Sequence, residues 1–474
     1  MPELLPATHR AKMQLTYWQR ALTVREQSGD VGGVAESLNN IGSIYRAQGQ
    51  FEDAQDSFQR ALVLLNRTND RPGMAMTLGN ISECYAEAGR LEEAVKAGEQ
   101  ALAVRERLGD ASAIATTHVL IASFLRGLWR EDEAQKHLER ALAMREAVGS
   151  PSEVVECLLA LSAIHTRLGR LAEALRAAQR ALSLAEKSNN GAEVAASLTS
   201  IGLAQIRLGR IEQALEGLRR ALGLREDLQD TAGAADTLSV IGEAYQAHQR
   251  QDTAQEHLQR ALDMQESLGR VEPIGRTLSR MGRSYFAQGR LALAMNAQLR
   301  ALSILEGLGD QIAIAAILGE LGATYGAQGR KNEALDFYKR ALALQEKQGN
   351  PNVIAETLIQ TGGILEEVGK AAEGQQLFRR ALSLLEPLSD KLAIARACRT
   401  LARSLWGTGG RTEAIPLLER ALDIHNQAGM RTETIRELET LSRCYSDLGQ
   451  QPRAERYLLA ATQLRSEGPG GQRG

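Results

Sequence analysis

The chain has 474 residues, of which 43% are hydrophobic and 24% charged, with a formal net charge of −2. Its 56 basic and 58 acidic residues are balanced, which excludes a field over the whole molecule that would draw it to nucleic acid or a membrane surface. No stretch approaches about 18 uninterrupted apolar residues and the start lacks a signal-peptide pattern, so we expect a soluble cytoplasmic protein.

One pattern runs through the chain with a fixed period of 40 residues. The stretch Gln-Arg-Ala-Leu at residues 59–62 returns in variants with its alanine in register, and no insertion or deletion shifts it. Such a period is typical of a solenoid, in which each unit buries its apolar face only against its neighbours. We therefore predict one all-α solenoid. The repeated alanine stands at Ala21, Ala61, Ala101, Ala141, Ala181, Ala221, Ala261, Ala301, Ala341, Ala381, Ala421 and Ala461.

The chain begins with an incomplete unit. We predict an extended segment over residues 1–10, followed by a single helix over residues 11–30 that lacks a helix to pair with. Trp18 stands in this helix where the next unit carries Phe58, so it can serve as an end cap. The alternative is that the chain is a fragment of a longer array.

Residues 31–70 represent the full unit. Its first helix, helix A, places apolar residues such as Leu38, Ile41 and Tyr45 at the three-and-four spacing of one helix face. Gly49 ends helix A, as glycine does at a left-handed C-terminal position. Eleven such units make up residues 31–466, and they start at residues 31, 71, 111, 151, 191, 231, 271, 311, 351, 391 and 431.

The second helix, helix B, has acidic residues in its first turn, where they oppose the positive end of the helix dipole. Beyond it, a side chain that can accept a hydrogen bond from the next helix A recurs, and only Arg270 and Met430 fail there. The predicted N-caps are Asp30, Asp70, Asp110, Ser150, Asn190, Asp230, Asp310, Asn350 and Asp390.

These units resemble the tetratricopeptide repeat. Helix A carries its Leu-Leu-Gly-Tyr type of signature and helix B its Ala-Phe-Ala signature, here as Leu38, Ile41, Gly42, Tyr45, Ala54, Phe58 and Ala61. The usual repeat has about 34 residues and a closing proline. This longer unit is similar to those of kinesin light chains, the Pins and LGN polarity adaptors and many bacterial regulators. The resemblance implies a right-handed α-α superhelix of 11 antiparallel helix pairs plus one orphan helix.

The resemblance also implies that helix A builds a concave wall that binds a protein or peptide. In the first two units this wall offers the carboxamides of Asn39, Asn40 and Asn80, which can both donate to and accept from a peptide backbone. Related adaptors use asparagines at the positions of Asn40 and Asn80.

Units three to five present an apolar strip on the same wall. Either it anchors apolar ligand side chains or it reflects tighter packing between helices. The residues are Val119, Leu120, Leu159, Leu203 and Ile206.

From unit seven the wall turns basic. Arginine forks suit carboxylates or phosphates, so we expect acidic residues in the ligand, although a solvated face is the alternative. The residues are Arg276, Arg280, Arg283, Arg396, Arg399, Arg403, Arg436 and Arg443.

Residues 467–474 predict a disordered tail, and the last helix has no following repeat to cover Tyr457, Leu458 and Leu459. An apolar end of this kind favours a neighbouring domain, end-to-end self-association or simple fraying.

No catalytic or metal-binding motif is present, and His118 and His165 replace core residues as expected of packing side chains. The four scattered cysteines form no CxxC pair. We predict no enzyme, no metal and no cofactor.

The leading functional hypothesis is a protein-interaction scaffold that binds a peptide with an apolar centre and acidic residues. The alternative is the sensor array of a larger bacterial signalling or effector protein. Nucleic-acid binding is disfavoured by the charge balance and by the absence of aromatics interleaved with the arginines.

Overall fold

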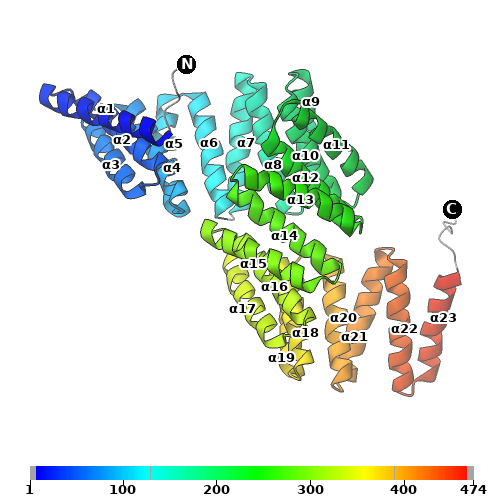
Figure 1. Ribbon diagram of the computed structural model, residues 1–474. Coiled ribbons are helices and arrows are strands. Elements are labelled where there is room, and N and C mark those ends of the chain that lie inside the picture. Colours follow the sequence, from blue (N-terminus) through cyan, green and yellow to red (C-terminus); the bar gives the residue numbers. More distant parts are fainter. Residues whose placement is uncertain (1–6, 129, 389, 467–474) are drawn as a thin grey trace. The chain divides into compact units, whose positions relative to one another are not determined.

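The computed structural model describes residues 7–128, 130–388 and 390–466. Within these ranges it contains 23 α-helices and no strand, which confirms the predicted all-α fold of helix pairs. The chain divides into two compact units, Met1–Gly269 with α1–α13 and Arg270–Gly474 with α14–α23. Figure 1 shows the antiparallel helix pairs that make up each unit.

The helices A are the even-numbered helices and are nearly uniform in length. They are α2 (Val31–Ala47), α4 (Arg71–Glu87), α6 (Ala111–Gly127), α8 (Pro151–Arg167), α10 (Gly191–Arg207), α12 (Thr231–Ala247), α14 (Val271–Ala287), α16 (Gln311–Ala327), α18 (Pro351–Glu367), α20 (Lys391–Gly407) and α22 (Arg431–Asp447).

The helices B are the odd-numbered helices. They are α1 (Ala7–Ser28), α3 (Phe51–Arg67), α5 (Leu91–Leu108), α7 (Glu131–Val148), α9 (Leu171–Lys187), α11 (Ile211–Asp227), α13 (Gln251–Ser267), α15 (Leu291–Leu308), α17 (Lys331–Gln348), α19 (Ala371–Leu385), α21 (Arg411–Gln427) and α23 (Gln451–Ser466).

The two chain ends differ from expectation in one respect. Helix α1 begins at Ala7, so residues 7–10 are helical rather than extended. The predictions for residues 1–6 and for the tail at 467–474 fall outside the described residues. The first and last helices both expose large apolar side chains, including Met13 and Tyr17 on α1 and Leu458 and Leu459 on α23. End-to-end self-association stays a prediction.

In several pairs a glycine on helix A lies against a large side chain on helix B, which lets the two helices pack closely. A Cβ atom at Gly42 would stand 2.7 Å from the ring of Phe58, and one at Gly322 would stand 2.9 Å from the ring of Tyr338. Both rings are buried. Glycine inside a helix costs about 1 kcal/mol relative to alanine, but here a side chain would collide with the aromatic ring.

The caps also follow the sequence pattern. Eight of the nine predicted N-cap side chains accept a hydrogen bond from the first turn of helix A, and Ser150 alone does not. The left-handed turns fall on the glycine ladder, as at Gly49 with φ 74°. Gln229 and Gln249 adopt the same left-handed φ without being glycine.

A ladder of ion pairs joins consecutive helices B. In each pair an arginine equivalent to Arg60 reaches a glutamate 34 residues earlier, as Arg180 reaches Glu146 at 2.5 Å and Arg420 reaches Glu386 at 2.5 Å. The further pairs are Arg220–Glu186, Arg260–Glu226, Arg340–Glu306 and Arg380–Glu346. Each is exposed and contributes at most about 1 kcal/mol, and together they link neighbouring repeats along the helices B.

The helices A form the inner layer within each unit. Several consecutive helices A touch one another, for example α8 with α10, α10 with α12 and α14 with α16. No two helices B make comparable contacts among the described residues. The layer whose helices approach more closely lies on the concave side, so the exposed side of helices A, called the inner face below, is the concave one within each unit.

Candidate binding face of the helices A

Asn39 is not on the inner face. It is only 4% exposed, and its Nδ2 donates a hydrogen bond to Thr77 Oγ1 on the next helix A at 2.9 Å. The prediction of Asn39 as a ligand-binding residue is therefore wrong. Its position points between neighbouring helices A, where it joins two repeats.

Asn40 and Asn80, one residue further on, are half-buried and remain at the inner face. Asn40 donates to the backbone oxygen of Glu36 at 2.9 Å, which leaves its side-chain oxygen as an acceptor. Beside them, Arg46 forms ion pairs with Glu83 and Glu87. These carboxamides are thus neutral polar groups next to an arginine that is already neutralised.

The apolar strip of α6, α8 and α10 is largely packed against the core. Val119 and Leu120 lie against a cluster that contains Ile121 and Phe124. Leu159 and Leu203 are also half-buried and pack on core residues. Ile206 is buried, with 8% exposure, so its prediction as a groove residue is wrong. The strip is a shallow apolar surface, and most of its area stabilises helix packing.

Two histidines next to this strip are packing residues, as predicted. His118 Nδ1 lies 2.8 Å from His137 Nδ1, and burial lowers the pKa of His118 to about 4. Burial also lowers the pKa of His165, whose ring faces Glu173 at 3.4 Å. Burial therefore favours the neutral form of both rings.

The arginines of α14 are engaged by carboxylates of the chain itself. Arg276 pairs with Glu272 one turn earlier, and Arg283 Nε lies 3.8 Å from Glu320 on α16. Arg280, between them, is half-buried and has contacts of its own. Two of the three arginines in this cluster are therefore paired with carboxylates of the chain itself.

Glu320 holds an unusual position on the inner face, equivalent to that of Asn40. Both carboxylate oxygens lie 3.3 Å from the hydroxyl of Ser279, and the side chain is only 18% exposed. Burial raises its pKa to about 7, against the opposing effects of Arg283 and Ser279. A carboxyl group with a pKa near neutrality in a binding face is a candidate functional group.

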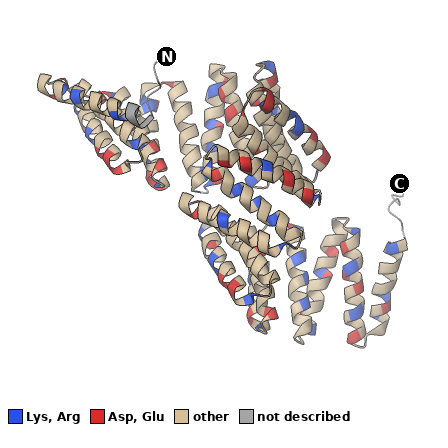
Figure 2. Ribbon diagram, viewed as in Figure 1, with Lys and Arg blue, Asp and Glu red and all other residues tan. Residues whose placement is uncertain are grey.

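Four arginines of α20 and α22 are exposed, and none has an ion-pair partner among the described residues, although Arg436 also acts electrostatically on the buried Glu437. Arg396 and Arg403 stand two turns apart on α20, and Arg436 and Arg443 occupy the equivalent positions on α22. None of the four forms an ion pair with a described carboxylate, and the one side-chain bond among them runs from Arg443 Nε to the Glu439 backbone oxygen. We call these four residues the arginine quartet; Figure 2 shows basic residues on both helices.

Arg399 does not belong to the quartet. Its Nη1 lies 3.5 Å from Glu437, which is fully buried on α22 beside His425 of α21 at 3.7 Å. Burial raises the pKa of Glu437 and lowers that of His425. The prediction of Arg399 as a free groove cation is wrong, because it neutralises an internal carboxylate.

Sequence reasoning overlooked Glu320 and Glu437, although a signal was present. Asn39 bonds to a residue 38 positions later, and Arg399 reaches Glu437 over the same separation. Comparing each helix A with the one that follows it, rather than treating each alone, identifies these inter-repeat pairs.

The family can now be assigned. A model of the tetratricopeptide repeat matches the chain six times, over residues 15–66, 33–107, 113–187, 193–267, 273–347 and 353–427. The chain belongs to the tetratricopeptide-repeat family. No curated protein matches the sequence.

Solved structures share the fold of this tetratricopeptide-repeat chain at low identity. A signal transduction ATPase with numerous domains (STAND) from Pyrococcus horikoshii, which carries a tetratricopeptide-repeat sensor, is 15% identical with a TM-score of 0.58. The match covers 74% of this chain but only 52% of that protein. A Rap protein complexed with competence and sporulation factor is 14% identical with a TM-score of 0.51, over 75% of this chain and 98% of that one.

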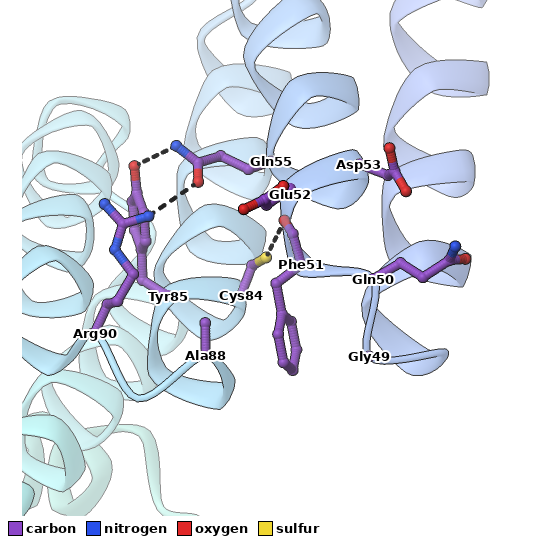
Figure 3. A pocket seen from close by; sticks show the side chains of 10 residues that line it. All are labelled: Gly49, Gln50, Phe51, Glu52, Asp53, Gln55, Cys84, Tyr85, Ala88 and Arg90. Carbon is purple, nitrogen blue, oxygen red and sulfur yellow. Dashed lines mark hydrogen bonds between the residues drawn. The ribbon is translucent and has the colours of Figure 1, made fainter.

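Elsewhere on the repeats, a cleft of about 460 Å³ opens between the turns of the first two pairs. Figure 3 shows its lining, in which Gln55 Nε2 donates to the Tyr85 hydroxyl and Arg90 donates to Gln55 Oε1. Cys84 donates to the Phe51 backbone oxygen. Gln55, Tyr85 and Arg90 of this lining thus bond to one another.

The described residues contain no group of three or more His, Cys, Asp or Glu side chains that could hold a metal ion. All four cysteines are buried and unpaired, and burial raises the pKa of each thiol above its usual value.

Tetratricopeptide-repeat proteins are generally non-enzymatic. No helix in the described ranges is both long and apolar enough to cross a bilayer.

Proposed function

We propose that this tetratricopeptide-repeat chain is a protein-interaction scaffold in the cytoplasm that binds an acidic segment of a partner protein on its inner face. The arginine quartet is the observation that carries the proposal. In a chain of net charge −2, four exposed guanidinium groups lie at equivalent positions of two consecutive helices A and form no ion pair with a described carboxylate. Arginine binds carboxylates through two parallel hydrogen bonds, which gives both affinity and orientation.

The spacing of the quartet restricts the partner. Arg396 and Arg403 are seven residues apart, so their Cα atoms lie about 10 Å apart along α20. The same holds for Arg436 and Arg443 on α22. Acidic residues three apart in an extended segment, or seven apart in a helix, span about the same distance. The partner is therefore a segment with at least two acidic residues at such a spacing.

Two further groups of residues complete the proposed face. Asn40 and Asn80 are positioned to bond to a peptide backbone, and the half-buried Val119, Leu120 and Leu159 offer apolar contacts. These lie in the first compact unit and the quartet in the second, so each unit is proposed to hold its own part of the partner.

The proposal is tested by capture of partners from the native host, followed by mass spectrometry. The variant Arg396→Glu/Arg436→Glu should lose the specific partner. The matched control Lys339→Glu/Arg456→Glu makes the same charge change on helices B α17 and α23 and should retain it. If both variants capture the partner equally, the quartet is not the binding site.

A second candidate function is the sensor array of a larger signalling protein. The shared fold with the STAND protein, whose tetratricopeptide repeats are described as a sensor, favours it. The Rap protein, solved with competence and sporulation factor, supplies a precedent for ligand binding on this fold. A longer reading frame around this chain that encodes an ATPase domain would favour the sensor array over an independent scaffold.

A further inference from the structure

The inner face of the second unit holds one carboxylate where a ligand-binding residue is expected. Glu320 on α16 contacts Ser279 and Arg283 of α14, and its side chain is 18% exposed while that of Arg283 is 48% exposed. The contact therefore lies at the inner face, and the Arg283 side chain is the more exposed of the two.

We propose that Glu320 controls Arg283, so that Arg283 becomes a second contact for acidic partner residues only when the Glu320 carboxyl is protonated. This inference rests on the proposed function, since it assumes an acidic partner segment. Ionised Glu320 neutralises Arg283 and repels a partner carboxylate. Neutral Glu320 removes that repulsion and leaves Arg283 to bind the partner.

The surroundings make Glu320 the group that titrates. Helix α14 presents Arg283 and Ser279, α15 presents the neutral Gln298 to Thr324, and α17 presents Tyr338, whose pKa burial raises to about 12. On α18, Glu356 is exposed and accepts a hydrogen bond from Gln360. Arg283 thus supplies the main charge that acts on Glu320, and burial opposes it.

The direction of the switch follows from that balance. Burial raises the pKa of Glu320 to about 7, so the carboxyl is ionised above this pH and neutral below it. Arg283 is therefore neutralised by Glu320 in mildly alkaline solution and becomes available to the partner as the pH falls through neutrality. The carboxylates of an exposed acidic peptide stay ionised over the same range, because their ordinary pKa is about 4.

The face around Glu320 has room for a partner chain. Ala316 is exposed and Ala323 half-buried, one turn before and after Glu320. A Cβ atom at Gly319 would meet nothing within 4 Å. Small side chains therefore surround the Glu320–Arg283 contact and leave the guanidinium accessible.

The experiment measures binding of a fluorescein-labelled peptide of alternating glutamate and alanine to the full chain by fluorescence anisotropy, at about pH 8 and about pH 6. For the wild type, Kd should fall on the order of three- to tenfold at the lower pH, because a repelling charge is removed. Glu320→Gln should bind with the low-pH affinity at both values. Glu356→Gln is the matched control and should keep the wild-type response.

Arg283→Gln provides a second variant, which should bind more weakly than the wild type at the lower pH, because the guanidinium that neutral Glu320 leaves to the partner is absent. The inference is overturned if Glu320→Gln keeps the pH response of the wild type, or if the wild type shows none. Failure of the proposed function gives a different result, since Arg396→Glu/Arg436→Glu would then bind the peptide as well as the wild type at both pH values.

Discussion

The two arginine clusters of the second compact unit share residue type and helix position but differ in available charge. On α14, Arg276 is paired with Glu272 and Arg283 with Glu320. The arginine quartet of α20 and α22 occupies equivalent positions and has no such partners among the described residues. The position on the helix puts the arginine at the inner face. The neighbouring residues then determine whether its charge is available to a ligand.

Single residue differences account for the contrast. The residue that follows Arg283 by 37 positions is Glu320, whereas the one that follows Arg403 by 37 positions is Thr440, whose hydroxyl bonds to its own helix. Four residues before Arg276 stands Glu272, but four residues before Arg396 stands Leu392. A repeat thus acquires or loses a cationic site through one or two substitutions.

The largest expected effect concerns the stability of the α14–α16 contact. Glu320 has a raised folded pKa, so the folded protein holds a proton up to about pH 7 that the unfolded chain releases near pH 4.5. Wild-type stability should therefore fall as the pH rises through this window, by on the order of 3 kcal/mol. Glu320→Gln should lack that fall. Urea unfolding followed by circular dichroism at both ends of the window measures the difference, and parallel curves for the two proteins would contradict it.

The internal pair of α20 and α22 gives the next effect. Arg399→Met leaves the buried Glu437 without its arginine and should lower the free energy of unfolding by about 2 kcal/mol, less than for a fully buried pair because Arg399 is one-third exposed. The double variant Arg399→Met/Glu437→Thr places at 437 the residue found at Thr357 in another repeat and should recover most of the loss. Urea midpoints of the three proteins test this; a double variant as unstable as Arg399→Met would show that the charge pair is not responsible.

The contrast between the clusters can also be reversed by design. Thr440→Glu gives Arg403 the partner that Arg283 has, and should weaken binding of the acidic peptide about tenfold, or about 1.4 kcal/mol. Thr440→Gln has a similar size without the charge and should bind as the wild type does. Anisotropy titrations of the two variants decide the point, and equal affinities would mean that Arg403 does not contact the peptide.

The smallest effect is expected at the exposed pair of α14. Arg276 and Glu272 are both more than half exposed, so Arg276→Ala should change the free energy of unfolding by less than about 0.5 kcal/mol. Its binding of the acidic peptide should stay within about twofold of the wild type, because the arginine is already neutralised. A large loss of binding would contradict this and would show that Arg276, like the quartet, contacts the peptide.

Most of the fold could be predicted from the sequence because its determinants are local. Apolar spacing marks the helix faces, the glycines mark the left-handed turns, and Asp30 and its equivalents mark the caps. The exceptions also have local causes. Gln249 adopts a left-handed turn that glycine would occupy more readily, and Ser150 makes no side-chain cap bond.

The binding face was less predictable because it depends on contacts between repeats. Within one helix, Asn39 and Asn40 both lie off the packed face, yet only Asn39 meets the next helix A. Arg399 likewise falls beside the quartet in sequence but reaches Glu437 across the repeat boundary. Such assignments need the register between neighbouring helices, which the periodicity of a single helix does not contain.

The ion-pair ladder of the helices B bears on how such an array changes length. Every pair spans 34 residues and every repeat 40, so excising one whole repeat rejoins an arginine to a glutamate at the same separation. Deletion of residues 191–230, for example, would bring Arg260 opposite Glu186 and leave no charge unmatched on this row. Duplication or deletion of a repeat that carries both the arginine and the glutamate therefore leaves this row of ion pairs matched, so the number of such repeats can vary without loss of these contacts between repeats.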